Sequence, residues 1–260
     1  MEKIWVREMV VRSFEPTNYF WSDTNFKLTN TRNVSPEEAI AIQERLRPLV
    51  QQTNSIALDQ IRTVAGIDVS YQDVGQAAIV VFSFPDLEII DQATATRESV
   101  FPYVPGLLSF REGPVVLDAM AKLKQQPDLL IFDGQGYAHP RRFGLACHLG
   151  LYLDRPSIGC AKTRLIGAYQ QPGPNKGDCA PLVDQGETIG MVVRTRANTN
   201  PLFVSVGHKI DLPTAVEAVL RCVRGYRLPE TTRAADHLAG SDQPPGRRRY
   251  KWRSHPMERL

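Results

Sequence analysis

Two aspartates stand in or directly after apolar runs of the chain, where a charged side chain loses its hydration. Asp68 lies within the run 64–71, and Asp133 follows the run 129–132 and precedes Gly134. A buried carboxylate is costly unless it is paired or binds a metal ion, so both aspartates are candidate metal ligands. The alternatives are an aspartate satisfied by an arginine or by backbone groups at Asp68, and a cap on the following helix at Asp133.

A third acidic residue, Glu112, directly precedes Gly113 and Pro114. Because proline suits the first turn of a helix, the sequence predicts a helix from Gly113 with Glu112 near its positive end. An ordinary charge at a helix N-terminus explains Glu112 equally well on its own. Together with Asp68 and Asp133, it forms a set similar to the carboxylate clusters of two-metal nucleases. Hard oxygen ligands of this kind favour Mg²⁺, with Mn²⁺ able to substitute, over zinc.

Two basic side chains could assist chemistry at such a centre. His139 is a candidate to orient a water or to contact a phosphate, since histidine changes its charge near neutral pH. Lys162 follows the apolar run 157–161 and could neutralise negative charge that develops during cleavage. A lone histidine or lysine is more often a surface residue, so both interpretations depend on the neighbouring carboxylates.

A stiff loop that carries an aromatic residue lies between the first and second acidic positions. Its residues are Pro102, Tyr103, Val104, Pro105 and Gly106. The two prolines limit its flexibility, and a loop of this kind can act as a wedge that fills the gap left by an extruded base. The alternative is a stiff connection between a strand and a helix.

Charge and composition narrow the class of protein. The chain has 260 residues and a formal net charge of +3, and residues 245–260 hold six basic residues and one acidic residue. Such a tail adds affinity for phosphates of any sequence, and a tail that merely aids solubility is the alternative. No stretch approaches the roughly 18 apolar residues of a membrane span, and residues 1–20 lack the apolar segment of a secretory signal. The four cysteines contain no CxxC pair, so we expect reduced thiols in a cytoplasmic protein.

The elements that must position these residues follow an α/β pattern. Three successive strands predict an antiparallel meander, and the later alternation of short apolar strands with helices predicts parallel βαβ units. The expected strands are 63–71, 77–84, 88–96, 129–132, 157–161, 188–196 and 201–206. The expected helices are 36–52, capped by Ser35, then 113–124, 143–153, 213–225 and 231–239. The predicted fold class is α/β, a mixed sheet flanked by helices, in which ligands tend to lie at strand ends.

Six segments of the chain carry a resemblance to a known family. They are 65–71 (Ala-Gly-Ile-Asp-Val-Ser-Tyr), 102–112 (Pro-Tyr-Val-Pro-Gly-Leu-Leu-Ser-Phe-Arg-Glu), 128–150 with the core Asp-Gly-Gln-Gly-x-x-His-Pro, 158–165, 205–209 and 227–233. In this order they resemble the endonuclease V family, the deoxyinosine 3′ endonucleases. We therefore expect a catalytic domain at 35–240, an N-terminal extension at 1–34 and a basic, disordered tail at 241–260.

The resemblance implies an RNase H-like fold and gives roles to individual residues. It implies Asp68, Glu112 and Asp133 as metal ligands, with His139 and Lys162 as further active-site residues. It places Tyr103 in the wedge loop. The walls of a pocket for a flipped-out base are implied at the wedge loop and at the backbone of Gly106, Leu107, Gly134, Gln135 and Gly136.

One more metal-site residue, an acid or a histidine, is implied after the Thr-Arg segment that ends at Arg233. Asp236 and His237 are adjacent there. The register from Arg233 favours Asp236, and His237 is the alternative.

The activity that the resemblance implies is hydrolysis of the second phosphodiester bond on the 3′ side of deoxyinosine. This leaves 3′-hydroxyl and 5′-phosphate ends and serves DNA repair, so the expected enzyme is a deoxyribonuclease V. The alternatives are an inosine-specific ribonuclease acting on single-stranded RNA and an inosine-binding protein that does not cleave. The expected partner is inosine-containing nucleic acid and not a membrane, and the expected state is a monomer.

Overall fold

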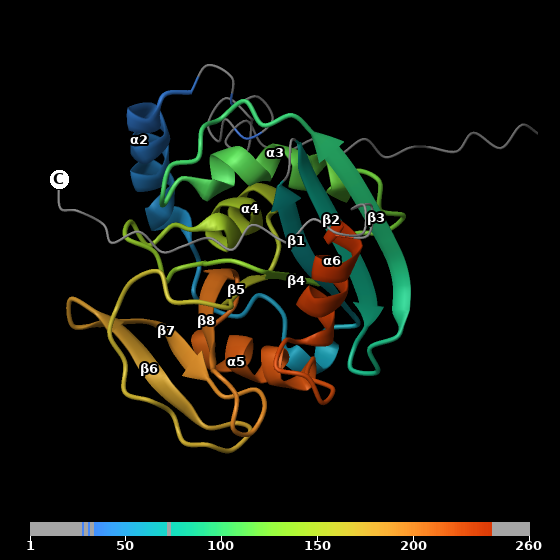
Figure 1. Cartoon of the computed structure of the whole chain (residues 1–260), viewed down its shortest axis with the longest axis vertical. Coiled ribbons are helices and arrows are strands. Elements are labelled where there is room, and N and C mark those ends of the chain that lie inside the picture. Colours follow the sequence, from blue (N-terminus) through green and yellow to red (C-terminus); the bar gives the residue numbers. More distant parts are fainter. Residues whose placement is uncertain (1–27, 29–30, 32–33, 72–73, 241–260) are drawn as a thin grey trace, which may run out of the picture.

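The computed structural model describes residues 28, 31, 34–71 and 74–240. Most of the expected N-terminal extension and the whole expected tail at 241–260 therefore lie outside the described residues. Over the described part of the chain, eight strands form one sheet in the order β3-β2-β1-β4-β5-β8-β7-β6 (Figure 1). The strands are β1 (Thr63–Tyr71), β2 (Gly75–Ser83), β3 (Ile89–Arg97), β4 (Leu129–Phe132), β5 (Ser157–Ala161), β6 (Cys179–Asp184), β7 (Glu187–Val193) and β8 (Leu202–His208).

The sheet has the mixed pairing that the sequence predicts. Strands β1, β2 and β3 form an antiparallel meander, and β4 and β5 extend it in parallel from β1. Strand β8 then pairs antiparallel with β5, followed by β7 and β6. The predicted α/β fold class is confirmed, and the parallel centre places the carboxyl ends of β4 and β5 beside the second half of β1, where Asp68 lies.

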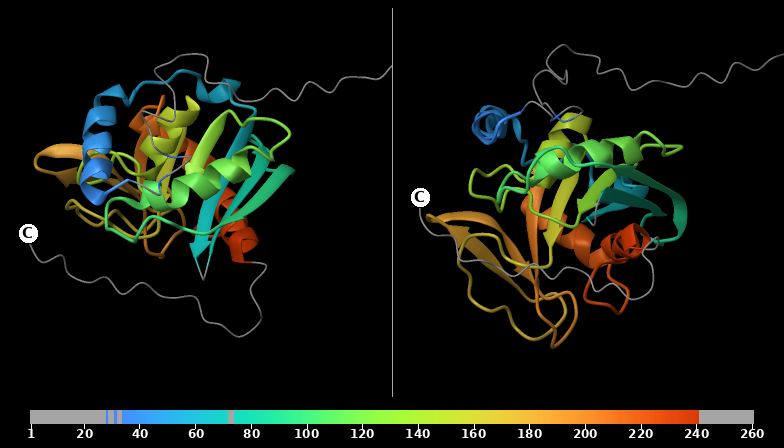
Figure 2. Two further views of the ribbon diagram at one scale, coloured as in Figure 1. Left: turned by 90° about the horizontal axis from the view of Figure 1, so that it is seen from above. Right: turned by 45° about the horizontal axis from the view of Figure 1, so that its top comes forward.

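Helices cover both faces of the sheet. They are α2 (Pro36–Leu46), α3 (Leu108–Met120), α4 (Leu145–Leu153), α5 (Leu212–Arg221) and α6 (Glu230–Gly240). In β1, Ala65 and Ile67 pack with α2, α3 and α4, whereas Val64 faces the core shared with α5. Figure 2 shows α3 and α4 on one side of the strands and α5 and α6 on the other. This alternation follows from the period of two along a strand. None of the helices in the described ranges has the length and apolar character needed to span a bilayer.

The N-terminal boundary of α3 differs from the prediction. The helix begins at Leu108 and not at Gly113, so Pro114 lies inside it and Glu112 lies in its second turn, away from the positive end. Burial of Phe110 against the sheet explains the early start, because packing of an apolar face outweighs the local signal of proline. The prediction that Pro114 lies in the first turn of this helix was therefore wrong.

Other boundaries shift by a few residues, and one strand was missed. The predicted helix 36–52 ends its α-helical part at Leu46 and continues as a 3₁₀ turn, Arg47–Leu49. Its cap is as predicted, with Ser35 accepting from the N–H of Glu38. Strand β6 was not predicted, because it contains Pro181 and lies at the sheet edge, where proline is tolerated.

Candidate functional site

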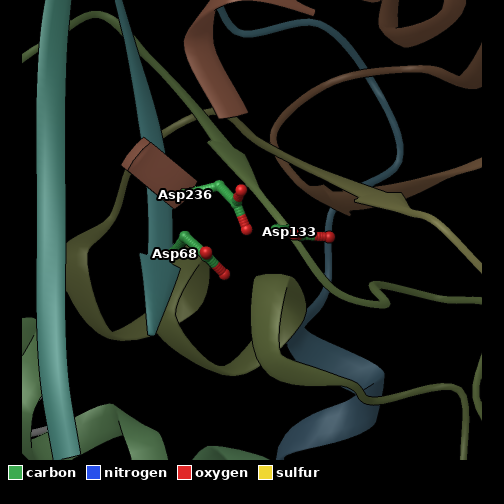
Figure 3. A group of neighbouring side chains, drawn as sticks. All are labelled: Asp68, Asp133 and Asp236. Atoms are coloured by element: carbon green, nitrogen blue, oxygen red, sulfur yellow. The ribbon is translucent and has the colours of Figure 1, made fainter. Parts of the chain in front are cut away.

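Three aspartates from separate elements meet beside the central strands. Asp68 lies in β1, Asp133 directly follows β4, and Asp236 lies in α6. One carboxylate oxygen from each lies within 4.8 Å of the other two, and Figure 3 shows the three side chains as neighbours. The parallel pairing of β1 with β4 joins the first two, since the N–H of Asp133 donates to the carbonyl of Ile67 at 2.9 Å. His237, the alternative to Asp236, is exposed.

A glycine in β1 allows the helix that carries Asp236 to approach. A Cβ atom at Gly66 would lie 2.0 Å from the backbone oxygen of Thr231 in α6. No side chain fits at this position, so α6 lies directly against the strand. Asp236 follows Thr231 by about one and a half helical turns, which brings its carboxylate over Asp68.

Lys162, directly after β5, supplies the nearest positive charge to the aspartates. Its Nζ forms an ion pair with Asp133 and a second one, of 3.1 Å, with Asp236. Burial alone would lower the pKa of Lys162, but Asp133, Asp68 and Asp236 together raise it. The lysine is therefore held in its charged form and partly balances the carboxylates.

The acidic groups carry more negative charge than their surroundings compensate. Burial, and then the charge of Asp133, raise the pKa of Asp68 to about 8, although Lys162 opposes the shift. Burial also raises the pKa of Asp133. A cation with hard oxygen preference would relieve this repulsion. The donor set, three carboxylates within reach of one point, fits a divalent cation of that kind.

Glu112 lies close to the cluster without belonging to the group of three. It is buried in α3 and lines the same cleft as Asp68 and Asp133. Burial, followed by the charges of those two aspartates, raises the pKa of Glu112 well above its ordinary value. The glutamate therefore adds a third buried acidic group to the side of the cleft where Asp68 and Asp133 lie.

His139 lies at the wedge loop. Its Nε2 is 2.9 Å from the carbonyl oxygen of Gly106, and its Nδ1 accepts from the backbone N–H of Arg141 at 3.2 Å. The two contacts fit a neutral ring with the proton on Nε2. Burial and the charge of Arg141 lower the pKa of His139 to about 4. This geometry favours a role in holding the loop over a role as a base.

The carboxylates and the wedge loop share one cleft of about 870 Å³. Tyr103, Val104, Pro105 and Gly106 line it, and the side chain of Tyr103 is half-exposed. Gly134 and Gln135 also line it, as does Lys162. Three other residues expected at the pocket or wedge do not line this cleft: Pro102 is exposed, Leu107 is buried in the core, and Gly136 is buried with its N–H donating to Ser205 Oγ.

The sequence did not indicate that two helices begin at this cleft. Leu108, at the start of α3, and Gly144 and Leu145, at the start of α4, line it. Among the described residues, no side chain caps either helix. The N-terminal turns of a helix leave amide N–H groups without intrahelical partners. Some of these groups have partners in the adjacent loops, since the N–H of Phe110 donates to the carbonyl of Leu107 and that of Ala146 to the carbonyl of Gln135. The glycine before α4 was the available signal.

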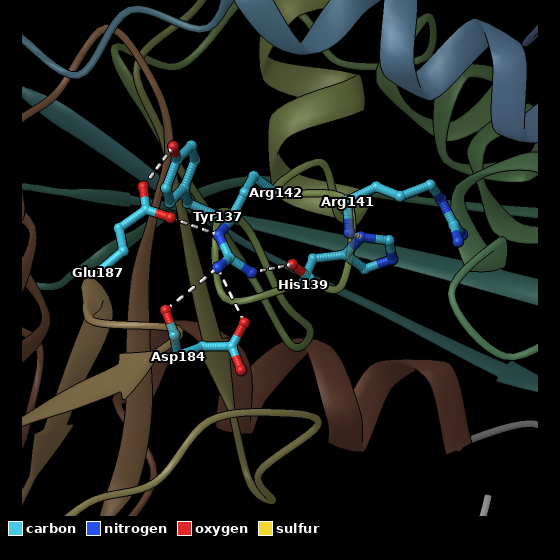
Figure 4. Close-up of polar contacts among 6 residues, drawn as sticks. All are labelled: Tyr137, His139, Arg141, Arg142, Asp184 and Glu187. Atoms are coloured by element: carbon cyan, nitrogen blue, oxygen red, sulfur yellow. Dashed lines mark hydrogen bonds and ion pairs between the residues drawn. The ribbon is translucent and has the colours of Figure 1, made fainter. Parts of the chain in front are cut away.

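The loop that carries His139 is fixed from its other side by an arginine. Arg142 is buried and forms ion pairs with Asp184 (2.8 Å) and Glu187 (2.7 Å) at the turn between β6 and β7. Tyr137 donates to the same glutamate at 2.8 Å, and Figure 4 shows the network behind His139. The loop is therefore tied to the β6–β7 hairpin, which limits movement of His139.

Comparisons with known proteins show which family the chain belongs to. A family model described as Endonuclease V matches residues 44–237. The endonuclease V of a Roseiflexus species is 53% identical over 209 residues, which cover 80% of this chain and 93% of the relative. The solved structure of endonuclease V from Streptomyces avermitilis is 44% identical, with a TM-score of 0.76, and covers 80% of this chain and 92% of that one.

A further solved structure contains nucleic acid. It is endonuclease V of Ciona intestinalis in complex with a 24mer DNA containing an inosine followed by a ribo-adenosine. It is 26% identical, has a TM-score of 0.70, and covers 79% of this chain and 96% of that one. The mixed sheet with flanking helices is the RNase H-like fold of these structures. The model match and the relatives together show that the chain belongs to the endonuclease V family.

Proposed function

We propose that this enzyme hydrolyses a nucleic-acid strand beside a deaminated base, hypoxanthine, with divalent cations held by Asp68, Asp133 and Asp236. The observation that supports the proposal most strongly is the convergence of these carboxylates beside Lys162 in a cleft bordered by the wedge loop. Glu112, in the same cleft, completes the proposed ligand set. Hard carboxylate ligands favour Mg²⁺, with Mn²⁺ as a substitute.

Each side chain has a defined task in this proposal. The three aspartates hold and orient the cation, which when bound activates a water and offsets the charge of the cleaved phosphate. Lys162, which the carboxylates keep protonated, contacts the phosphate oxygens and balances the charge that develops on them. The strand is cut at the second phosphodiester bond on the 3′ side of the lesion, leaving 3′-hydroxyl and 5′-phosphate ends.

The N-termini of α3 and α4, which lie at the cleft, support a preference for hypoxanthine over adenine. Deamination replaces the amino group of adenine, a hydrogen-bond donor, by a carbonyl oxygen, an acceptor. An amide N–H of the first turn of α3 or α4 that faces the cleft would donate to this carbonyl, and it would leave the amino group of adenine unpaired. A donor left unpaired in a closed pocket is penalised, which gives discrimination.

The metal site predicts a coupling between pH and cation binding. Binding of Mg²⁺ to the metal-free protein is expected to release protons and to strengthen as pH rises toward about 8. The carboxyl group of Asp68, whose pKa is raised to about 8, still carries a proton at neutral pH, and this proton must leave before the oxygen can bind the ion.

The same shift has a consequence for stability without metal. Between the unfolded value of 3.8 and about 8, the folded chain binds more protons at Asp68 than the unfolded chain does. The free energy of unfolding of the metal-free protein therefore falls as pH rises across this window.

Titration calorimetry in two buffers of different ionisation enthalpy measures the protons released when Mg²⁺ binds. Binding at pH 7 with no release would contradict the assignment.

Tyr103 is expected to contribute to binding of the lesion strand through its ring. Tyr103→Ala should raise the dissociation constant for an inosine-containing strand about 5- to 100-fold, because base–aromatic stacking is lost. Affinity for Mg²⁺ should not change. Tyr226→Ala is a matched control, since Tyr226 is similarly exposed, 55% against 50%, and is not among the residues that line the cleft. Equal effects of the two substitutions would remove the wedge role from Tyr103.

Removal of metal tests the proposed function directly. After treatment with EDTA, cleavage of an inosine-containing DNA strand should fall to background, and added Mg²⁺ or Mn²⁺ should restore it. Cleavage that persists in excess EDTA would overturn the proposal. Cleavage of a matched RNA strand tests a second candidate function, that of an inosine-specific ribonuclease. The ribo-adenosine after inosine in the Ciona complex favours this candidate. A faster cut of the RNA would select that candidate.

A further inference from the structure

One carbonyl of the wedge loop receives three hydrogen-bond donors. The oxygen of Gly106 accepts from Gln43 Nε2 at 3.0 Å, from His139 Nε2 at 2.9 Å and from the Arg141 guanidinium at 2.7 Å. Gly106 has a φ of +80°, and a Cβ atom there would lie 2.9 Å from the same guanidinium. The loop is therefore fixed two residues before the start of α3, at a position whose backbone conformation favours glycine.

Gln43 joins this carbonyl to the loop that precedes α4. It is buried in α2, and its Nε2 also donates to the carbonyl of Phe143 at 3.1 Å. Its Oε1 accepts from Nε of Arg141 at 2.5 Å. One amide thus binds the wedge loop on one side and the loop from His139 to the start of α4 on the other. It also lines the cleft.

The chemistry of this position is specific to an amide of this length. Glutamate could accept from Arg141 but could not donate to either carbonyl, and methionine could do neither. A glutamine that only forms hydrogen bonds with buried polar groups would not need to contact two loops that both border one ligand cleft. Gln43 also lies one residue before the segment 44–237 that the family model matches, and it was not among the candidate residues from the sequence.

We propose that Gln43 is a positioning residue for lesion binding. It sets the separation of the wedge loop from the loop at the start of α4, and so the width of the cleft that takes the deaminated base. The inference rests on the proposed function, because it assigns the cleft to that base. Arg141 belongs to the same hydrogen-bond network, since it contacts both Gln43 and Gly106. His139 is the third donor to the carbonyl of Gly106.

The test uses the full chain with Mg²⁺ and single-turnover cleavage of an inosine-containing DNA strand. Gln43→Met should raise the enzyme concentration at half-maximal rate about tenfold to a hundredfold, because the carbonyls of Gly106 and Phe143 both lose a donor. The maximal rate should fall less than about threefold, since the aspartates are untouched. Binding of the matched inosine-free strand should stay at the wild-type value. Glu38→Gln, on the exposed face of α2, is the control and should match wild type.

Two further variants separate positioning from general loss of structure. Gln43→Glu keeps the contact with Arg141 and loses both donated bonds, so it should show the same shift as Gln43→Met. Combining Gln43→Met with Arg141→Met should have no more effect than the larger single change, because both act on one carbonyl. Thermal melting identifies temperatures at which every variant is folded.

Three results would overturn the inference. They are unchanged lesion affinity in both Gln43 variants, an equal loss of affinity for lesion and plain strands, or multiplicative effects in the double variant. If the wild type itself does not distinguish the inosine strand, the proposed function fails first. If the wild type does distinguish it, and both Gln43→Met and Gln43→Glu bind it with wild-type affinity, the positioning role alone is wrong.

Discussion

Asp133→Ala is expected to lower the single-turnover rate of cleavage of an inosine-containing strand about 10³-fold in Mg²⁺ while leaving much of the strand affinity intact. Asp133 faces Asp68, Asp236 and Lys162 at once. Its loss removes a cation ligand and a partner of the lysine, both of which act on the reacting phosphate. The wedge loop and the helix starts are untouched, so lesion binding has no reason to disappear.

A surface aspartate provides the control for this substitution. Asp86 is exposed in the turn between β2 and β3, and Asp86→Ala should retain the wild-type rate. The metal-free Asp133→Ala protein should not be less stable than wild type near neutral pH, because a carboxylate whose charged form is disfavoured has been removed. Cleavage at the wild-type rate in Mg²⁺ would remove Asp133 from the ligand set.

Gly66→Ala is the second substitution with a large expected effect. The new methyl group would lie 2.0 Å from the Thr231 oxygen, and that oxygen is backbone, so either β1 or α6 must move. Movement of α6 by about an ångström displaces Asp236, and misplacement of that size costs about 10²-fold in rate. Overpacking is expected to destabilise the fold by about 1–3 kcal/mol. Rate measurements below the melting temperature separate the two effects.

Ser70→Ala distinguishes displacement from simple loss of a contact between the same two elements. The Ser70 hydroxyl donates to the carbonyl of Ala239 in α6 at 2.7 Å. Its removal costs about 1 kcal/mol and introduces no clash, so the rate should fall less than tenfold. A Gly66→Ala enzyme as active as Ser70→Ala would show that Asp236 does not depend on this close approach.

The parts of the fold that the sequence predicted best are the buried central strands. Strands β4 and β5 have the predicted bounds, Leu129–Phe132 and Ser157–Ala161, because a short apolar run buried on both faces has few alternatives. Edge strand β6 was missed, since its proline and partial exposure weaken the pattern. The start of α3 was wrong because a local proline signal was preferred to the burial of Phe110.

The site residues also divide into those that the local sequence indicates and those that it does not. Asp68 and Asp133 could be found because acids within apolar strands are unusual, and the structure brings Asp236 to them through α6. Gln43 and Arg142 gave no signal, since their partners are far away in sequence. The bond from Gln43 to Phe143 spans 100 positions, and that from Arg142 to Glu187 spans 45. Only the folded chain reveals such long-range polar contacts.

The most direct test of lesion-dependent, metal-dependent cleavage compares two end-labelled DNA strands that differ at one position. One carries a single inosine and the other carries adenine there, and both are incubated with the wild-type enzyme and Mg²⁺. The account predicts a single cut at the second phosphodiester bond 3′ of the inosine, with 3′-hydroxyl and 5′-phosphate ends, and an intact adenine strand. Equal cutting of both strands, or no cutting of either, would contradict it.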